Sequence, residues 1–418
     1  MTLAPDAAGV VVIGAGTAGS AAAAHLSAAG VDVLLLERSA ESDTRPGAAA
    51  LTPAAVRELE VLGLPQSDTA GWHRTTGVRF VGGGMRLALA WPDAQGRATH
   101  GLTVARSVLD ATLAAYAVRS GARLRRATEV VALTRGSDGR VSGVTTADGS
   151  TVRADVVVDA SGGALTTATS HATTHGPVAV SADFDSPRHG DDHVESWLRL
   201  SAGDGAALPG HGWIVGRGDG RVTVGVGALA DTTATTDACA GVLRRWLTAL
   251  PANWELTEDT MTGPVAGSRL ATTSRGERRS ADGLLAVGDS ASVAHPVTGE
   301  GVAAALTSAR LAAVVVARAL AHPAGAAREA ELTAYDVLDG ALGRHRTLAR
   351  TAARAFDRPL VTRLATTYVL PRQPLMKLAL GALTTPTPAA VETCVTPSTM
   401  GRVTRAADPG TERGVDQR

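Results

Sequence analysis

The chain has 418 residues, of which 44% are apolar and 19% charged, and its forty basic side chains balance forty acidic ones. This length and composition exclude a mini-domain and a mostly disordered chain, and they predict a folded body with two lobes. The zero formal net charge gives no electrostatic reason to expect nucleic acid or an anionic membrane surface as the main partner.

The N-terminal part of the sequence predicts a parallel βαβ unit followed by a hairpin. The capping residue Thr52 and the stop at Gly63 bound a helix within LTPAAVRELEVLGL. The other predicted elements are strands at 9–13 and 31–36, a helix at 17–29, two strands joined by a turn at 77–90, a helix at 104–121, and short β-rich runs around Val130, Val141 and Val152.

The remaining sequence predicts a second β-rich region and then helices. Strands are expected at VAVSADF, VESWLRL, GWIVGR and RVTVGVG, within residues 178–229. A helix is expected from Cys239 to Leu250, a return to the first sheet at GLLAVGDSA, and a long helix over 301–321.

Cysteine usage and apolar patterning indicate the compartment. Cys239 and Cys394 form no CxxC pair, so the sequence predicts neither a zinc site nor a disulfide framework. The N-terminus lacks the pattern of a signal peptide. The longest apolar stretch, 302–321, contains two arginines, which are costly at bilayer depth, and it is therefore expected to be a core helix. We expect a cytoplasmic protein with at most peripheral membrane contact.

The segment VVVIGAGTAGSAAAAHL carries the strongest local motif. Gly14, Gly16 and Gly19 fit G-x-G-x-x-G at a strand-to-helix junction, where the backbone can approach a pyrophosphate at the helix N-terminus. Glu37 ends the second strand about 20 residues further on, where a carboxylate can accept hydrogen bonds from ribose hydroxyls. A glycine-rich turn without a ligand is the alternative interpretation.

A second motif, LLAVGDSASVAHPVTGEGVAAAL, places Asp289 after a buried strand and Gly299 to Gly301 at the start of a helix. A helix N-terminus aimed at an electron-rich ring can stabilise negative charge on a reduced flavin. This second junction favours FAD over NAD as the dinucleotide.

The sequence from about Val10 to Leu383 resembles the geranylgeranyl reductase family of FAD proteins, in particular its actinobacterial branch. The resemblance rests on GAGTAG, LLLER, RPGAAALTPAAVREL, GLTVARSVLDATL, VVVDASG, SPRHGDDHVESWLRL, GHGWIVGRGDGRVTVGVG and VGDSASVAHPVTGEG. It implies non-covalent FAD and the fold of the aromatic-hydroxylase type of flavin monooxygenase. That fold is α/β, with a Rossmann-type FAD-binding domain interleaved with an antiparallel β-sheet substrate domain, followed by C-terminal helices.

The resemblance also implies a set of cofactor-binding residues. Glu37 and Arg38 would contact the AMP half of FAD, Arg106 the pyrophosphate, Val130 the adenine through its backbone, and Asp289 the ribityl chain. The implied set is Gly14, Ala15, Gly16, Thr17, Ala18, Gly19, Glu37, Arg38, Arg106, Val130, Gly288, Asp289, Pro296, Gly299, Glu300, Gly301 and Val302.

The chain departs from the family pattern around the expected substrate site. Gly47 and Ala48 stand where family members usually carry a cysteine and a glycine, and His211 stands where a tyrosine is common. The pocket candidates are His211, Trp213 and His295. His295 is either an acid or base near the flavin or a buried structural histidine.

Other polar clusters receive no chemical role. His189 and His193 flank two aspartates with a spacing that resembles a metal site, but such runs are common in exposed polar turns, and no metal is predicted. Ser290 lacks the G-x-S-x-G context of a nucleophile.

The predicted division of the chain is discontinuous. Residues 1–75, 101–165 and 270–325 would form the FAD-binding domain, and 76–100 with 166–269 the substrate domain. Residues 326–400 would form a helical region, and 401–418 a mobile tail.

The preferred hypothesis is hydride transfer from flavin N5 to a carbon–carbon double bond of an apolar, isoprenoid-like or polyketide-like substrate. The alternatives are a flavin monooxygenase or oxidase acting on an aromatic or polyketide metabolite, and a catalytically silent flavin-binding protein. A halogenase ranks last, because HGWIVG replaces the WxWxIP signature. No NAD(P)H domain is visible, so the electron donor would be transiently docked NAD(P)H or a partner reductase. The sequence predicts no oligomeric state.

Overall fold

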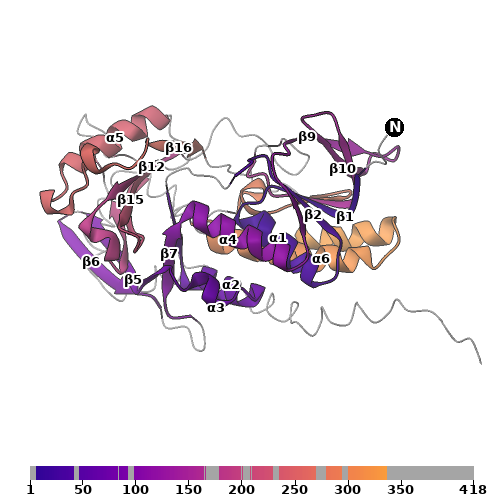
Figure 1. Ribbon diagram of the computed structural model, residues 1–418, viewed down its shortest axis with the longest axis horizontal. Coiled ribbons are helices and arrows are strands. Elements are labelled where there is room, and N and C mark those ends of the chain that lie inside the picture. Colours follow the sequence, from indigo (N-terminus) through magenta and orange to yellow (C-terminus); the bar gives the residue numbers. More distant parts are fainter. Residues whose placement is uncertain are drawn as a thin grey trace, which may run out of the picture.

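The computed structural model describes residues 6–41, 47–82, 84–92, 98–163, 165, 178–198, 200, 208, 210–228, 235–269, 279–293 and 300–336. The predicted C-terminal region beyond 336 and the tail lie outside these residues. The described chain forms two lobes, each with its own sheet and its own cluster of buried apolar side chains (Figure 1).

An eight-stranded sheet forms the centre of the first lobe. Five of its strands run parallel in the order β18-β11-β1-β2-β8. They are β1 (Asp6–Ile13), β2 (Val33–Leu36), β8 (Arg123–Arg125), β11 (Thr151–Asp159) and β18 (Leu284–Ala286). Antiparallel β17 (Ser280–Ala281) lies beside β18, and the hairpin β9 (Val130–Arg135) and β10 (Val141–Thr146) extends from β11. The sheet therefore joins segments from three distant parts of the chain.

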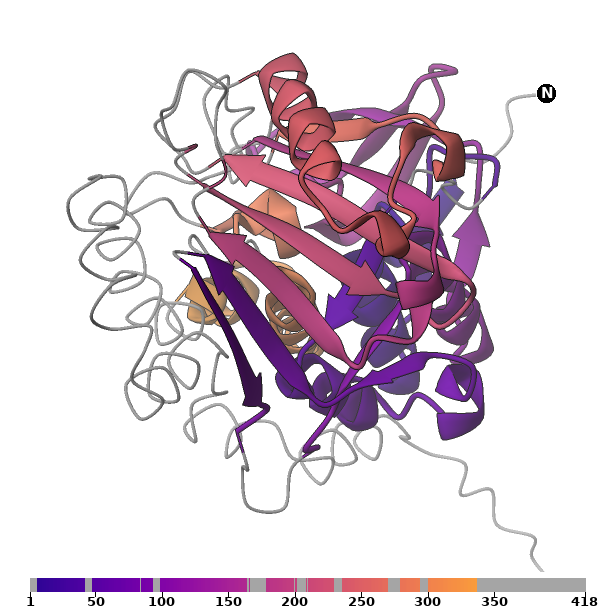
Figure 2. The same cartoon turned by 90° about the vertical axis from the view of Figure 1, so that its left-hand side faces the viewer.

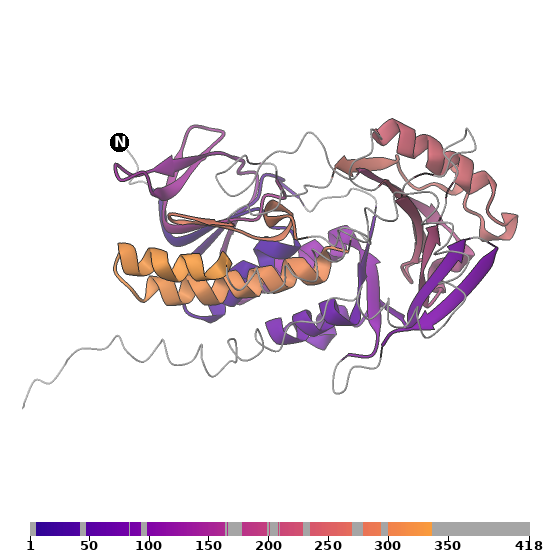
Figure 3. The ribbon, with the colours of Figure 1, turned by 180° about the vertical axis from the view of Figure 1, so that it is seen from behind.

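Helices cover this sheet (Figures 1 and 3). Helix α1 (Thr17–Ala28) packs between α4 (Arg106–Arg119) and α6 (Val302–Leu320). Every residue of α1 from Thr17 to Leu26 is buried, which explains a helix composed almost entirely of small residues. Helix α2 (Pro53–Leu62) and the short α3 (Gln66–Thr69) follow at the lower edge.

The predicted ends of α2 are confirmed. The Thr52 hydroxyl oxygen accepts a hydrogen bond from the Ala55 N–H, and Pro53 occupies the first turn. Gly63 ends the helix in the left-handed region, at φ 84°.

Helix α6 is long and apolar enough to cross a membrane, with a mean hydropathy of 1.6, but 78% of that stretch is buried inside the protein. Its arginine Arg310 is buried too, and it donates two 2.8 Å hydrogen bonds to the Glu58 carboxylate of α2. The positive charge of Arg310, which would be costly inside a membrane, is thus neutralised by Glu58 inside the protein core.

A small antiparallel sheet connects the lobes and was not predicted. It has the order β3 (Ala48–Leu51), β7 (Gly101–Ala105), β4 (His73–Thr75). The helix predicted over 104–121 therefore begins only at Arg106. Alanine favours helix in isolation, yet AAAL at 48–51 is extended because it pairs with β7.

The second lobe is a seven-stranded sheet in the order β16-β12-β15-β14-β13-β5-β6. Its strands are β5 (Gly77–Gly82), β6 (Met85–Ala90), β12 (Val178–Asp185), β13 (His193–Leu198), β14 (Gly210–Gly216), β15 (Arg221–Ala228) and β16 (Ala266–Arg269). The four strands predicted within 178–229 pair antiparallel as expected, whereas the added strand β5 pairs with β13 in parallel, which the sequence did not predict. Helix α5 (Thr236–Thr248) covers one face, the face turned away from the first lobe (Figures 1 and 2).

Besides a helical stretch over residues 326–336, the described chain contains four short 3-10 helices. They are η1 (Pro187–Gly190), η2 (Ala252–Trp254), η3 (Glu258–Thr260) and η4 (Gly288–Ala291). Of these, η4 begins directly after the first-lobe strand β18 and precedes α6, so it lies at the second sequence motif.

We expect Glu58→Ala to lower the free energy of unfolding by about 3 to 5 kcal/mol, because it leaves the buried Arg310 guanidinium without its carboxylate. Chemical denaturation with Glu60→Ala as the control checks this, since Glu60 is exposed on the same helix. The double variant Glu58→Leu with Arg310→Met should recover most of the loss. A Glu58→Ala protein as stable as the control would contradict the conclusion that Glu58 neutralises the buried Arg310.

Candidate active site

The three glycines of the first motif serve different physical purposes. Gly14 has φ +95°, and a Cβ there would lie 2.6 Å from the carbonyl oxygen of Ala160. A Cβ at Gly19 would lie 1.9 Å from the Gly14 carbonyl oxygen, so this glycine allows α1 to pack on the turn. A Cβ at Gly16 would meet nothing within 4 Å. Gly16 is thus the position where the backbone borders open space.

The N-terminus of α1 keeps hydrogen-bonding capacity for an anion. Its N-cap Gly16 has no side chain to cap the first turn. Behind the turn, the Ala15 N–H donates to Glu37 Oε2 at 2.8 Å, and the Ser39 N–H donates to Oε1 at 2.9 Å. Glu37 is half-buried at the end of β2, while Arg38 points outward as an exposed residue.

The start of β9 lies beside Glu37. The Thr128 N–H donates to the Glu37 carbonyl at 2.9 Å, and the Ala127 N–H donates to the carbonyl of Ser39. Val130, the half-buried first residue of β9, follows this segment directly. Val130 therefore lies two residues after Thr128, whose N–H contacts Glu37, the residue that follows β2.

Helix α4 is tied to the same helix N-terminus through Asp110. Thr17 donates its hydroxyl to Asp110 Oδ1 at 2.7 Å, and Arg106 Nε donates to Oδ2 at 3.1 Å. The Arg106 side chain is half exposed. Sequence analysis missed Asp110, although its spacing of four from Arg106 on a helix is a recognisable signal.

The second motif converges on the first. Gly288 has φ +60°, and a Cβ there would lie 2.7 Å from the Ala18 Cβ of α1. Its N–H donates to the Ser308 hydroxyl of α6 at 3.1 Å. The 3-10 helix η4 is therefore held between α1 and α6, and the two predicted junctions meet.

Asp289 follows at this convergence. Burial raises the pKa of its carboxyl; the charge of Arg106 opposes that shift, and the charge of Asp110 adds to it. Within the described chain no side chain or backbone N–H donates a hydrogen bond to this half-buried carboxylate. It therefore keeps its capacity for hydroxyl donors of a ligand.

The end of β11 is locked to η4 by hydroxyls. Ser290 donates to Asp159 Oδ1 at 3.1 Å and accepts from the Gly163 N–H at 3.2 Å, and the Ser161 N–H donates to the same Asp159 oxygen. These bonds give Ser290 a structural position. The segment DASG at the end of β11, which belongs to the VVVDASG motif of the family resemblance, thus helps to hold η4 in place.

Glu300, named from the sequence only as a residue lining the flavin, also caps a helix. Its Oε1 accepts from the Ala303 N–H at 2.8 Å, so the carboxylate caps the N-terminus of α6. Burial raises the pKa of Glu300, and the backbone N–H groups of Ala303 and Val302 oppose that shift. Gly301 is the N-cap of α6 and Val302 its first residue. His295, Pro296 and Gly299 lie outside the described residues.

The face of the second sheet opposite α5 carries the remaining candidates. His211 and Trp213 both lie on β14, with ring centroids 5.8 Å apart. Burial lowers the pKa of His211 to about 4. Asp183 on β12 accepts from the Gly47 N–H, from Arg217 at 2.7 Å and from the Thr223 hydroxyl at 2.6 Å. Asp183, which sequence analysis missed, thereby links the first lobe to this face.

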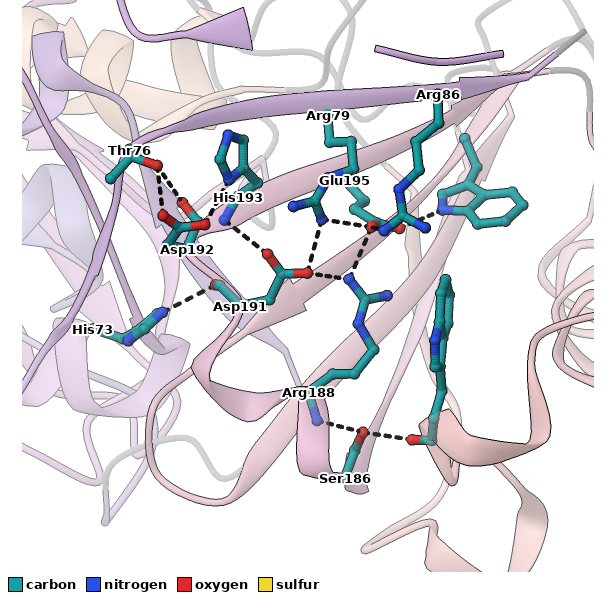
Figure 4. A network of polar contacts seen from close by, with 12 residues as sticks. His73, Thr76, Arg79, Arg86, Ser186, Arg188, Asp191, Asp192, His193 and Glu195 are labelled. Carbon is teal, nitrogen blue, oxygen red and sulfur yellow. Dashed lines mark hydrogen bonds and ion pairs between the residues drawn. The ribbon is translucent and has the colours of Figure 1, made fainter. Parts of the chain in front are cut away.

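The turn that contains His189 and His193 lies beside a network of charged side chains centred on Glu195 (Figure 4). Glu195 lies on the same face of the sheet as Trp197, which contacts Trp246 of α5. Arg79, Arg86 and Arg188 donate to Glu195 Oε1 at 2.7, 2.6 and 2.8 Å, and Trp197 donates to Oε2. The Glu195 side chain is fully buried. These bonds connect β5, β6, η1 and β13, and so stabilise the parallel pairing of β5 with β13.

Asp191, Asp192 and His193 lie close enough together to hold a metal ion, but each is engaged by other side chains. Asp191 accepts from Arg79 and Arg188 (Figure 4). Asp192 accepts from the Thr76 hydroxyl at 2.8 Å and contacts His193 Nδ1 at 2.6 Å. The arrangement is that of an ion-pair network.

Comparisons with known proteins identify the family and the fold. A family model described as an FAD binding domain matches residues 7–338. The menaquinone reductase of Mycolicibacterium smegmatis is 35% identical over 313 residues, 73% of this chain and 75% of that protein. Digeranylgeranylglycerophospholipid reductase 1 of Methanopyrus kandleri is 30% identical over 338 residues, 74% and 80% of the two chains.

A geranylgeranyl bacteriochlorophyll reductase-like structure from Thermoplasma acidophilum superposes with a TM-score of 0.70 at 19% identity, covering 94% of this chain and all of that one. Structures of a probable FAD-dependent monooxygenase and a flavin-dependent brominase, at 18% and 20% identity, share the fold. Fold, site and comparisons together define an FAD-dependent oxidoreductase. The chain belongs to the geranylgeranyl reductase family of FAD-binding proteins.

We expect Gly16→Ala to weaken FAD binding at least about tenfold, because the methyl group enters the open space that the backbone leaves for the pyrophosphate. The fold should persist, since that Cβ meets nothing within 4 Å. Flavin titration and thermal unfolding of the FAD-free protein check both parts. Gly71→Ala, where a Cβ also meets nothing, is the control and should bind FAD normally.

We expect Glu195→Gln to destabilise the protein by about 3 to 5 kcal/mol near neutral pH, because three arginines lose their shared charge. Burial alone would raise the pKa of Glu195, but hydrogen bonds from Arg188, Trp197 and Arg79 outweigh it and hold the pKa below its ordinary value.

The pH dependence of that stability has a defined sign. The contribution of Glu195 to stability is present above the ordinary glutamate pKa of 4.5 that it has in the unfolded chain, and it disappears as the pH falls through the lower folded pKa. Denaturation midpoints from pH 7 down to pH 3 should therefore decline less in Glu195→Gln than in the wild type. Glu258→Gln, at an exposed side chain, should follow the wild-type curve.

Proposed function

We propose that this protein uses non-covalently bound FAD to reduce a carbon–carbon double bond in an isoprenoid chain. The observation that carries the proposal is the similarity, over about three quarters of the chain, to reductases named for a prenylated quinone and for a geranylgeranyl lipid. The apolar face of the second sheet supports it independently.

That face offers a stripe of apolar side chains. Val78, Leu89 and Trp91 are buried there, and Phe80, Met85, Leu87 and Leu198 pack against them while keeping exposed surface. An isoprenoid chain is aliphatic, so burial along this stripe gains about 25 cal/mol per Å² of apolar surface removed from water. The stripe would orient the chain and exclude water from the double bond.

We propose the following cofactor contacts. The N–H groups at the start of α1 and Arg106 would hold the pyrophosphate, and Glu37 a ribose. Asp289, whose carboxylate has no hydrogen-bond donor among the described residues, would accept from ribityl hydroxyls. Val130 would meet the adenine, and Glu300 with the N-terminus of α6 would line the flavin ring. FAD, when bound, supplies the hydride.

Burial lowers the pKa of His211 to about 4, which disfavours His211 as a proton donor near neutral pH. We propose His295 as the proton donor, because the family resemblance places an imidazole near the flavin there. We propose NAD(P)H or a partner reductase as the electron donor, and the cytoplasm, with at most peripheral membrane contact, as the location.

We expect anaerobic mixing of the dithionite-reduced protein with a geranylgeranyl lipid to reoxidise the flavin. A prenylated quinone also accepts two electrons on its ring, so its product is reoxidised in air to the quinone before analysis. The product should then be two mass units heavier for each double bond reduced. Flavin absorbance in a stopped-flow instrument and mass spectrometry of the product check this.

The matched variant is Asp289→Asn, which should weaken FAD binding because an amide accepts less strongly than a carboxylate. Asp282→Asn, an exposed position in the turn before β18, is its control. Absence of reoxidation by every prenyl compound, together with oxygen-dependent hydroxylation of an aromatic compound, would replace the reductase proposal with a monooxygenase.

A further inference from the structure

The two faces of β14 point to different surroundings. A Cβ at Gly212 would lie 2.6 Å from the Trp246 ring of α5, and Ile214 belongs to the core beneath that helix. Because side chains alternate along a strand, His211 and Trp213 lie on the opposite face. Ser181 lies on this second face of β12, 3.7 Å from a Cβ built at Gly47 of the first lobe. The face of His211 and Trp213 therefore looks toward the FAD-binding lobe (Figure 1).

Trp213 lies flat on this face because its neighbours on β15 are glycines. A Cβ at Gly225 would lie 2.1 Å from Cζ2 of the indole, and one at Gly227 would lie 3.3 Å from Cζ3. The indole thus crosses β15 where no side chain separates it from the backbone. It remains half-buried, and it gives the sheet a planar aromatic surface of the kind on which another ring stacks.

His211 stands at the edge of this surface with unused hydrogen-bonding capacity. Neither ring nitrogen has a hydrogen-bond partner among the described residues; its ring contact is with Trp213. A neutral imidazole offers one N–H donor and one acceptor nitrogen. His211 is half-buried, so a ligand oxygen that replaces water at the imidazole gains a hydrogen bond in a site that is largely shielded from solvent.

The apolar stripe begins on the other side of the imidazole. His211 pairs across the strands with Leu198 of β13. Leu198 packs against the buried cluster of Val78, Leu89 and Trp91, as do Phe80, Met85 and Leu87. The order along the face is thus an aromatic plane, a neutral hydrogen-bonding group and an aliphatic stripe.

We propose that His211 determines substrate specificity by hydrogen-bonding an uncharged oxygen on a planar ring that stacks on Trp213, with the ring's prenyl chain lying along the Leu198 stripe. This inference rests on the proposed reduction of an isoprenoid chain and narrows its substrate to a prenylated quinone or hydroquinone. A prenyl diphosphate or phospholipid carries anionic oxygens, which cationic donors bind best, and on this face the guanidinium of Arg217 is already paired with Asp183.

Equilibrium binding to the oxidised, FAD-loaded protein tests the inference without any turnover. The probes are a menaquinone with four prenyl units, geranylgeranyl diphosphate, and the naphthalene analogue of that menaquinone lacking both carbonyl oxygens. Binding is followed by the change in flavin absorbance. The variants are His211→Phe, which keeps a ring without nitrogen, and His211→Gln, which keeps a donor and an acceptor; Ser181→Ala, on the same face, is the control.

We expect the wild type to bind the quinone at least about tenfold more tightly than either other probe. His211→Phe should weaken quinone binding about tenfold, equal to about 1.4 kcal/mol, and leave the other two probes within about twofold. His211→Gln should retain most of the quinone affinity. Equal losses for all three probes, or no loss for the quinone, would overturn the inference.

One comparison within these data does not depend on any variant, so misfolding of a variant cannot affect it. In the wild type alone, equal affinity for the quinone and its deoxygenated analogue would also overturn the inference. If the proposed reduction is wrong, no prenyl compound will reoxidise the reduced flavin. If only this inference is wrong, the ligands will bind with affinities that do not depend on the ring oxygens.

Discussion

The site depends on the close approach of η4 to the N-terminus of α1. That approach needs a residue without a Cβ at Gly288, in the left-handed region, directly against Ala18. The Ser308 hydroxyl fixes Gly288 from α6, and Asp159 fixes Ser290 from β11. These contacts set one carboxylate, that of Asp289, near a helix end that no side chain among the described residues caps. A dinucleotide flavin needs both kinds of group at one place.

Sequence patterns predicted the elements whose causes are local. The glycine turn before α1, the Thr52 cap and the Gly63 stop each follow from backbone geometry within a few residues, and the structure has them at those positions. The buried strands β1, β2 and β11 were predicted because apolar runs of their length form parallel sheets. The family assignment is confirmed by the comparisons.

The elements that the sequence did not predict depend on distant partners. Nothing within AAAL indicates that Ala48–Leu51 will pair with β7, and nothing in either segment indicates that β5 runs parallel to β13. The same limit applies to the site. The contacts of Asp183 with Gly47 and Thr223, and of Asp110 with Thr17, join residues far apart in the sequence, and residue type alone does not reveal them. The cofactor residues named from the family resemblance, and the pocket histidines, stay predictions.

The interleaved topology bears on how the protein is made. Strand β1 lies next to β11, and β11 next to β18, so the central sheet closes only after about residue 286 has been synthesised. The hairpin of β5 and β6 likewise waits more than a hundred residues for β13. Such non-local pairing slows folding and leaves strand edges unpaired in the nascent chain. The nascent chain therefore carries unpaired strand edges through most of its synthesis, and the convergence of η4 on the start of α1 forms only near its end.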